Sequence, residues 1–166
     1  MASPELLTSF YFSVKLSGGG SGTDAAFQEV SGLSKEFGME EVSSGGENRF
    51  KYRLPGHVSY PNLVLKRGIV LTDSPLIEWC QRTLDAGLAD PVQTRDITLR
   101  LLDENGHVSM SWNFVKAYPI KWSMSDLKSQ ESSILIETIE LAYHYFEVDD
   151  PRNDQYAAVA SLFGDN

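Results

Sequence analysis

Hydrophobic and polar residues alternate with a period of two along most of the chain, a pattern typical of half-buried β-strands. In residues 10–16, one face of the predicted strand carries Phe10, Phe12, Val14 and Leu16. Further strands are predicted over residues 26–33, 50–54 and 62–68, with residues 35–42 as a continuation of the strand at 26–33. The first 70 residues or so therefore indicate a mainly β protein.

Segments rich in glycine, serine and proline separate these strands. Residues 17–22 and 43–48 predict loops, and no helix with the Lys-Ser/Thr of a phosphate-binding loop follows the first of them. The sequence Leu54-Pro55-Gly56 is expected to break the strand that precedes it. Proline lacks the N–H of the strand ladder, and glycine permits unusual backbone angles.

A single helix is predicted over about residues 74–86. Ser74 is a suitable N-cap, Pro75 suits the first helical position, and Gly87 suits the C-terminal stop. The apolar stripe of this helix would be Leu76, Ile77, Cys80 and Leu84. Cys80 is interpreted as a small core residue.

The second half of the chain returns to alternation. Residues 95–103 and 107–115 predict a hairpin across Asn105-Gly106, and residues 118–124 a short extended stretch that begins at a kink at Pro119. Residues 131–148 are compatible with a helical period, but their content of Ile, Thr and Tyr favours a strand. Such a strand would carry apolar residues on both faces, which suggests that a neighbouring subunit covers the outer face.

Composition and charge narrow the functional classes. The 166 residues suit one domain, and 42% hydrophobic residues allow a packed core. The net charge of −9 argues against a nucleic-acid backbone as partner, because phosphate binding needs clustered Lys and Arg. Cys80 is the single cysteine, so an intrachain disulfide is excluded. No signal peptide and no apolar run near the roughly 20 residues of a membrane helix is visible.

The sequence offers no catalytic constellation, and we expect no catalytic residue, no cofactor-binding residue and no metal ligand. His57, His107 and His144 are scattered and form no metal-binding pair. Trp112 and Trp122 suit a stacking site for a sugar or a base, but on alternating strands core or interface positions are the preferred interpretation.

Taken in order, these segments resemble the tail-tube proteins of contractile phages and the inner-tube proteins of extracellular contractile injection systems. The stretch most distinctive of the family is Arg53-Leu54-Pro55-Gly56 followed by Asn62-Leu63-Val64-Leu65-Lys66-Arg67-Gly68. Residues 10–16, Val30-Ser31-Gly32-Leu33, the helix with Trp79, the hairpin with its Trp112-Asn113-Phe114 exit and residues 134–143 match further family elements. The resemblance covers about residues 8–148.

The resemblance implies a tail-tube-type β-barrel or sandwich of two packed antiparallel sheets with one flanking helix. It divides the chain into a tail-tube domain, residues 1–148, and a C-terminal extension, residues 149–166, whose spacing would suit a short helix. Hexameric rings would stack into a hollow tube that sheath contraction drives through a target envelope. The residues expected to stack ring on ring are Glu40, Glu41, Glu47 and Arg49, and those expected in an inter-subunit sheet are Leu135, Ile139, Leu141 and Tyr143.

The implied partners are further copies of the chain, a contractile sheath protein, baseplate or spike and cap proteins, and a luminal cargo protein, or DNA in a phage. We expect assembly in the bacterial cytoplasm, without a signal peptide or a direct membrane anchor, into a phage-tail-like particle that is released or cell-anchored. Two alternatives remain open. One is a specialised tube-initiating or adaptor ring at the baseplate or cap, and the other is a monomeric β-sandwich module that binds a ligand.

Overall fold

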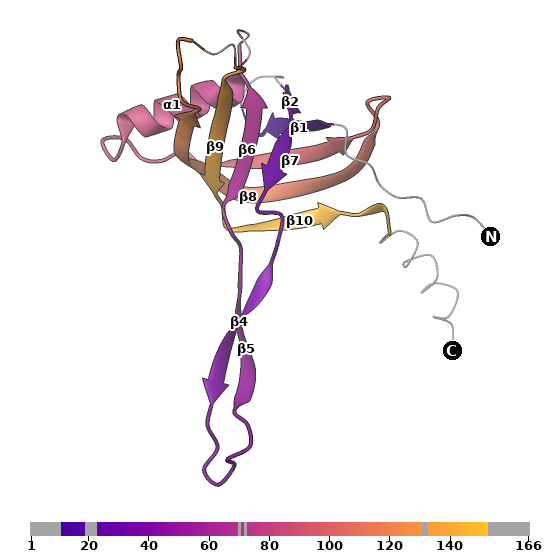
Figure 1. Ribbon diagram of the computed structural model, residues 1–166, viewed down its shortest axis with the longest axis vertical. Coiled ribbons are helices and arrows are strands. Elements are labelled where there is room, and N and C mark those ends of the chain that lie inside the picture. Colours follow the sequence, from indigo (N-terminus) through magenta and orange to yellow (C-terminus); the bar gives the residue numbers. More distant parts are fainter. Residues whose placement is uncertain (1–10, 19–22, 70, 72, 131–132, 153–166) are drawn as a thin grey trace, which may run out of the picture.

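The computed structural model describes residues 11–18, 23–69, 71, 73–130 and 133–152. Its elements are ten strands and one helix (Figure 1): β1 (Tyr11–Leu16), β2 (Thr23–Phe27), β3 (Glu29–Ser31), β4 (Glu36–Val42), β5 (Tyr52–Ser59), β6 (Leu63–Gly68), α1 (Pro75–Ala86), β7 (Arg95–Leu102), β8 (Val108–Met124), β9 (Ile136–Ala142) and β10 (Tyr145–Asp149). The prediction of a mainly β fold with one helix and two antiparallel sheets is confirmed.

Eight strands form one antiparallel sheet that curls into a barrel (Figure 1). Its hydrogen-bonded order is β2-β1-β7-β8-β9-β6-β3, with β10 added to β8. The two strands at the ends of this path, β2 and β3, follow each other in the chain and are separated by Gln28. The Gln28 N–H donates to the Lys66 carbonyl at 3.0 Å. The continuous segment of β2 and β3 therefore pairs first with β1 and then with β6, and this pairing closes the barrel.

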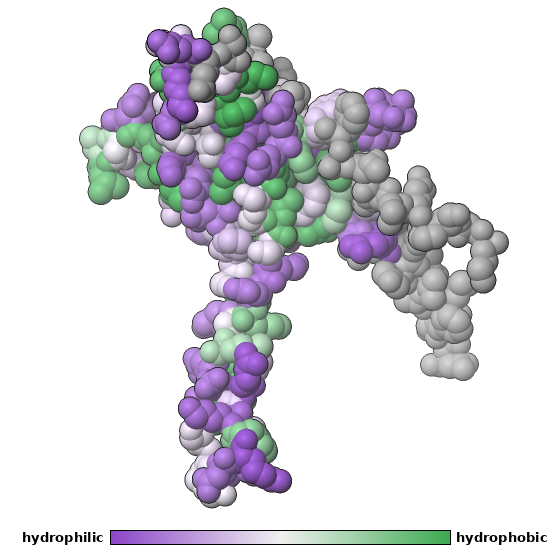
Figure 2. Space-filling model, viewed as in Figure 1, coloured by the Kyte–Doolittle hydropathy of each residue, from purple (hydrophilic) through white to green (hydrophobic). Residues whose placement is uncertain are grey.

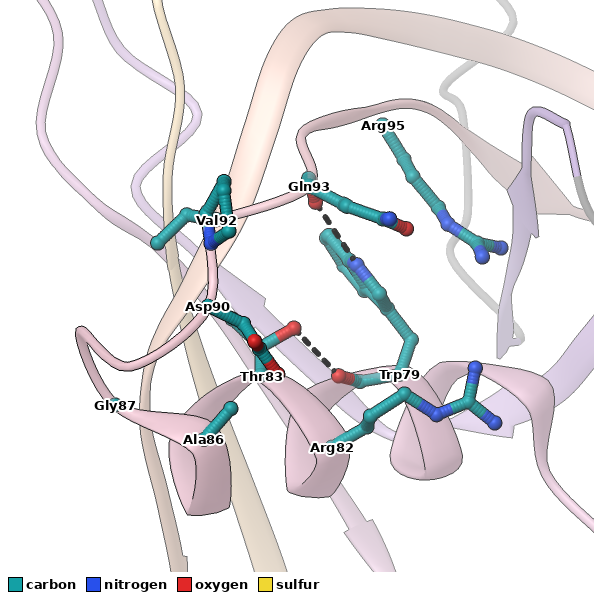
Figure 3. A pocket seen from close by; sticks show the side chains of 10 residues that line it. Trp79, Arg82, Thr83, Ala86, Gly87, Asp90, Val92, Gln93 and Arg95 are labelled. Carbon is teal, nitrogen blue, oxygen red and sulfur yellow. Dashed lines mark hydrogen bonds between the residues drawn. The ribbon is translucent and has the colours of Figure 1, made fainter.

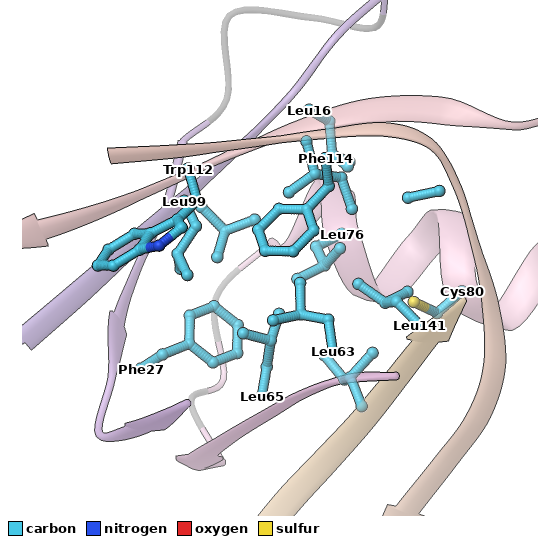
Figure 4. Packing of buried hydrophobic residues seen from close by; sticks show 14 of the residues in the cluster. Leu16, Phe27, Leu63, Leu65, Leu76, Cys80, Leu99, Trp112, Phe114 and Leu141 are labelled. Carbon is cyan, nitrogen blue, oxygen red and sulfur yellow. The ribbon is translucent and has the colours of Figure 1, made fainter. Parts of the chain in front are cut away.

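The barrel interior is filled from alternate positions of its strands. In β6 and β9 every second side chain is buried, as period-two strands require. Phe27, Leu65, Leu99, Phe114 and Leu141 are fully buried and point into one shared core (Figure 4). Burying such side chains stabilises the fold by about 1.5–3 kcal/mol each relative to leaving them in water.

The helix packs on the outside of the barrel, and its predicted bounds are confirmed. The Ser74 hydroxyl accepts a hydrogen bond from the Ile77 N–H, and Gly87 ends the helix with φ of 56°. The buried face is formed by Leu76, Trp79 and Cys80. Leu84, expected in the apolar stripe, is exposed, and Trp79 lies on the buried face instead.

The predicted strand at residues 26–33 is divided into β2 and β3, and the strand boundaries predicted at two prolines also differ from the structure. Leu54-Pro55-Gly56 does not break its strand, since β5 runs through it to Ser59. The ribbon of β4 and β5 has an open edge on each side, where a proline without an N–H is tolerated, and a β-bulge lies opposite Phe37 and Met39. The predicted extended stretch at residues 118–124 is the second half of β8, which runs unbroken through Pro119.

The predicted strand at residues 131–148 is divided into β9 and β10, which lie end to end along β8. Tyr118 pairs with Ala142 and Val115 with Tyr145, so one register is kept across the gap. The gap lies opposite Lys116, whose φ of 56° bends the long strand. The predicted C-terminal extension begins at the end of β10, and its residues 153–166 lie outside the described part of the chain.

Candidate assembly interface

The strands β4 and β5 form a hairpin that projects from one end of the barrel, and we call residues 36–59 the arm (Figure 1). Every residue of its two strands is exposed except the half-buried Gly56. The arm nevertheless carries large apolar side chains, and Phe37 is 58% exposed. Figure 2 shows these residues as green patches among purple polar ones. An isolated two-stranded hairpin is marginally stable in water, so this surface has the character of an interface.

The apolar side chains of the arm are divided between its two faces. Cross-strand partners lie on the same face, and the pairs Phe37–Val58 and Met39–Pro55 occupy one face near the barrel. The opposite face carries Val42, Tyr52 and Leu54 nearer the tip. Phe50 extends this second group, because its ring meets that of Tyr52 edge to face at 5.2 Å. The arm therefore presents a root face and a tip face.

All the residues predicted to stack ring on ring lie on the arm. Glu40 is opposite Leu54 on the tip face, whereas Glu41 is on the other face and its carboxylate lies 3.8 Å from Lys51 Nζ. At the turn, Arg49 donates from Nε and from its backbone N–H to the Glu47 carboxylate, each at 3.0 Å. These hydrogen bonds hold the pKa of Glu47 below its ordinary value and raise that of Arg49. Their contact with a second ring stays a prediction.

The residues predicted for an inter-subunit sheet are dispersed. Ile139 and Leu141 are fully buried in the core of this chain, and β9 is paired on both edges, with β6 and β8. Leu135 is half-buried, and its carbonyl accepts from the Ile69 N–H at 3.0 Å. Burial raises the pKa of Tyr143 to about 12. The apolar content of this strand is thus largely explained within the chain, and a contact with a neighbouring subunit stays a prediction.

A buried cluster of charges, which the sequence reasoning missed, joins the barrel to the helix. Arg67 is 4% exposed and donates from Nε to Glu137 at 3.2 Å, from Nη1 to Asp24 at 3.4 Å and from Nη2 to Ser74 Oγ at 2.9 Å. The Asp24 carboxylate also accepts from the Leu76 N–H at 2.9 Å, at the positive end of the helix dipole. Trp122 Nε1 donates to Glu137 at 2.8 Å.

The cluster connects β2, β6, β8, β9 and α1. It therefore holds the barrel closed and also holds the helix in place against the barrel. One signal in the sequence could have revealed it. Leu63 and Leu65 are on the buried face of β6, and Arg67 is the next residue on that same face. A charged residue at an inward strand position requires a buried partner.

A hollow of about 150 Å³ lies at the C-terminal end of α1 (Figure 3). Its wall includes Trp79, whose Nε1 donates to the Gln93 carbonyl at 3.1 Å, and Arg95, whose guanidinium lies 5.9 Å from the Trp79 ring centroid. Thr83 donates back to the Trp79 carbonyl at 2.8 Å. These contacts anchor the loop after the helix.

In the described residues, no three His, Cys, Asp or Glu side chains are close enough to hold a metal ion. Trp112 belongs to the core and Trp122 packs against it. No helix in the described ranges has the length and apolar character needed to span a bilayer.

Comparisons with known proteins bear on this architecture. A family model described as T4-like virus tail tube protein gp19 matches residues 8–147. A solved structure described as the six-fold symmetrised baseplate of the anti-feeding prophage (AFP) is similar, with a TM-score of 0.74 and 29% identity over 90% of this chain and 98% of that chain. A search of curated proteins found no match.

Two further solved structures share the fold at lower identity. The AFP tube-terminating cap gives a TM-score of 0.71 and 24% identity over 90% of this chain and 95% of that one. The sheath-tube complex of the extracellular contractile injection system PVC, in its extended state, gives 0.70 and 21% over 89% and 93%.

Proposed function

Because the chain belongs to the family of the T4-like virus tail tube protein gp19 and is a structural tube subunit, we propose that it builds the inner tube of a contractile injection system from stacked hexameric rings. The observation that carries this proposal is the extent of the family match, since residues 8–147 include the helix, the arm and the barrel up to the middle of β10. The function is mechanical. Sheath contraction drives the rigid tube through a target envelope, and the lumen carries the cargo.

The fold supports a mechanical role. The barrel is closed by its own strands, so a subunit keeps its shape under load without help from neighbours. The arm leaves the barrel with apolar side chains on two faces, which suits contacts between subunits and between rings. In this proposal the arm residues Glu40, Glu41, Glu47 and Arg49 take part in ring stacking, and Leu135 and Tyr143, which flank β9, approach a neighbouring subunit.

The proposed partners follow from the particles that the similar proteins come from. Those proteins are described as parts of a baseplate, a tube-terminating cap and a sheath-tube complex. We propose that a sheath protein surrounds the tube and that a baseplate or spike complex and a cap bind its ends. A cargo protein, or DNA, lies inside the tube. Assembly in the bacterial cytoplasm and a role without catalysis are parts of the same proposal.

Electron microscopy of the purified, concentrated protein tests the proposal, with sedimentation to measure the assembled mass. Hollow tubes with six-fold end views are the expected result. A chain that remains a monomer at every concentration, and that does not join tubes when mixed with its sheath and baseplate proteins, would contradict it.

A second candidate is a specialised ring at one end of the tube. It is favoured by one observation, since two of the similar structures are described as a baseplate and a cap. Single rings that never elongate would assign the chain to this role, whereas long tubes from the chain alone would assign it to the repeated subunit.

A further inference from the structure

A groove of about 390 Å³ lies where the arm leaves the barrel, and we call it the root groove. One wall is the segment that leads into β4, and the other is formed by β8 and β10. Its apolar lining is Leu33, Met110, Trp112, Phe146 and Val148. In the described residues β10 pairs with β8 alone, so its other edge is open beside the groove. Among the described residues, this end of the core is therefore covered incompletely.

One cation stands over this apolar lining. Lys35 Nζ lies 5.5 Å from the centroid of the Phe146 ring. Lys35 is exposed, and no carboxylate of the described residues lies within ion-pair distance of it. Asp150 at the far side of the groove is already bound to Arg152 through several hydrogen bonds. An occupant of the groove would thus meet an apolar floor with a positive charge at its edge.

The tip face of the arm has the complementary chemistry. Val42, Tyr52 and Leu54 supply an apolar surface, and Glu40 is the acidic residue on the same face. Glu40 makes no ion pair with the residues that the structure describes, whereas the neighbouring Glu41 points to the other face and meets Lys51. The tip face and the root groove therefore match in apolar character, and Glu40 on the tip face is opposite in sign to Lys35 at the edge of the groove, where Asp150 and Arg152 pair with each other.

We propose that the tip face of one copy docks in the root groove of a second copy, with the Glu40 carboxylate against the Lys35 ammonium. The inference rests on the proposed function and names the partner of the arm within the tube. Five residues separate Lys35 from Glu40, which is about 17 Å along an extended strand at about 3.3 Å per residue, so consecutive copies are offset along the arm by about that distance. Tip and groove are different surfaces of the same chain, so the contact is head-to-tail and can propagate.

A charge-exchange experiment tests this pairing. The variants Lys35→Glu and Glu40→Lys each place like charges in contact, and each is expected to reduce tube formation at least tenfold, because such juxtaposition is costly at an interface. The double variant Lys35→Glu/Glu40→Lys restores the attraction with reversed signs and is expected to recover assembly to within about threefold of the wild type. Sedimentation measures the assembled fraction, and circular dichroism confirms that each variant is folded.

A mismatched exchange is the control. Glu41 is adjacent in sequence but lies on the opposite face of β4, so Lys35→Glu/Glu41→Lys should not restore assembly. Equal rescue by both double variants, or no rescue by either while the wild type forms tubes, would overturn the pairing and leave the proposed function intact. A wild-type chain that forms neither rings nor tubes would overturn both.

Disulfide trapping gives a second readout that does not depend on charge. Mixing the single variants Lys35→Cys and Glu40→Cys under an oxidant should give a covalent dimer containing one chain of each kind. The native Cys80 does not interfere, because it is fully buried and burial raises its pKa to about 12. Assembled mixtures in which only dimers of a single variant form would contradict the contact.

Discussion

Replacing Arg67 by methionine tests how the barrel and the helix are held together. Methionine has a similar length and no charge, so the main change is the loss of the hydrogen bonds to Glu137, Asp24 and Ser74. The guanidinium also lies 4.7 Å from the centroid of the Phe27 ring, and that cation–π contact is lost as well. Two carboxylates, each 6% exposed, then remain in the core wall without their cation.

The expected loss in the free energy of unfolding follows from the burial of the charges around Arg67. Removing one partner of a buried ion pair destabilises proteins by about 3–5 kcal/mol, because the remaining charge is not compensated. We place Arg67→Met in this range, since the variant leaves two carboxylates and the helix dipole stabilises only Asp24, through the Leu76 N–H. With a urea m-value of about 2 kcal/mol/M, the unfolding midpoint falls by about 2 M.

An exposed ion pair of the same chain provides the matched control. Arg82 and Glu78 are 2.6 Å apart, closer than any pair in the buried cluster, but their side chains are 71% and 70% exposed. Arg82→Met should therefore cost less than about 1 kcal/mol. The contrast separates the effect of burial from the effect of distance.

Urea unfolding followed by tryptophan fluorescence measures both variants. Trp122 donates to Glu137, so its emission reports on the cluster directly. Midpoints are compared at a dilution at which they no longer depend on protein concentration, because assembly also stabilises the folded chain. If Arg67→Met is too unstable to purify, Arg67→Met/Glu137→Gln removes one of the two unpaired charges and should recover part of the loss. Equal costs for Arg67→Met and Arg82→Met would refute the reasoning.

Three further predictions concern single positions, and urea midpoints measure each of them. Gly32→Ala should lower the free energy of unfolding by at least about 2 kcal/mol, because φ is +90° and a Cβ would lie 2.0 Å from the Asn62 carbonyl oxygen. Gly45→Ala, with open space around the Cβ, should be nearly neutral. Equal costs for the two variants would contradict the argument. Ser74→Ala should lower the free energy of unfolding by about 1–2 kcal/mol, because the N-cap of the helix is lost. Ser74→Thr keeps the hydrogen-bond acceptor and should keep most of the stability. A Ser74→Ala variant as stable as the wild type would contradict this prediction. Burial raises the pKa of Cys80 to about 12 from an ordinary 9.0, so above about pH 9 the unfolded chain loses this proton while the folded chain keeps it. Stability should then fall by about 1.4 kcal/mol per pH unit between about pH 9 and 12, and Cys80→Ala should remove this contribution; identical alkaline slopes for both proteins would exclude it.

The elements that the sequence predicted well are those with local signals. Ser74, Pro75 and Gly87 define the helix by the backbone groups that they satisfy or leave unhindered, and the structure has the helix at Pro75–Ala86. Asn105-Gly106 likewise defined the hairpin turn, where Gly106 has a φ of 80° and its N–H donates to the Asp103 carbonyl at 3.1 Å. Each signal acts within a few residues, so no knowledge of the fold is needed to read it.

The features that were missed depend on partners far apart in the chain. Pro55-Gly56 suggests a strand end, but it lies inside β5, because β4 is the one partner of β5 among the described strands and the other edge of β5 is open to a residue without an N–H. The length of β8 was missed because Pro119 suggested a kink, whereas β9 pairs across it. The buried cluster requires Asp24, Arg67 and Glu137 to meet, and period-two alternation alone does not say which strands are adjacent.

The arm shows the same limit of local signals, because its strands could be predicted from the sequence and the exposure of its apolar side chains could not. Their alternation predicted strands correctly, but alternation normally marks one face turned to a core, and here both faces are exposed. A two-stranded ribbon gains little from its own contacts, so most of its stabilisation has to come from surfaces outside the chain. The barrel is closed by β2 and β3 and held together by the Arg67 cluster, so it does not depend on outside surfaces in the same way. One sequence thus specifies a barrel that buries its own core and an arm that leaves its apolar side chains exposed.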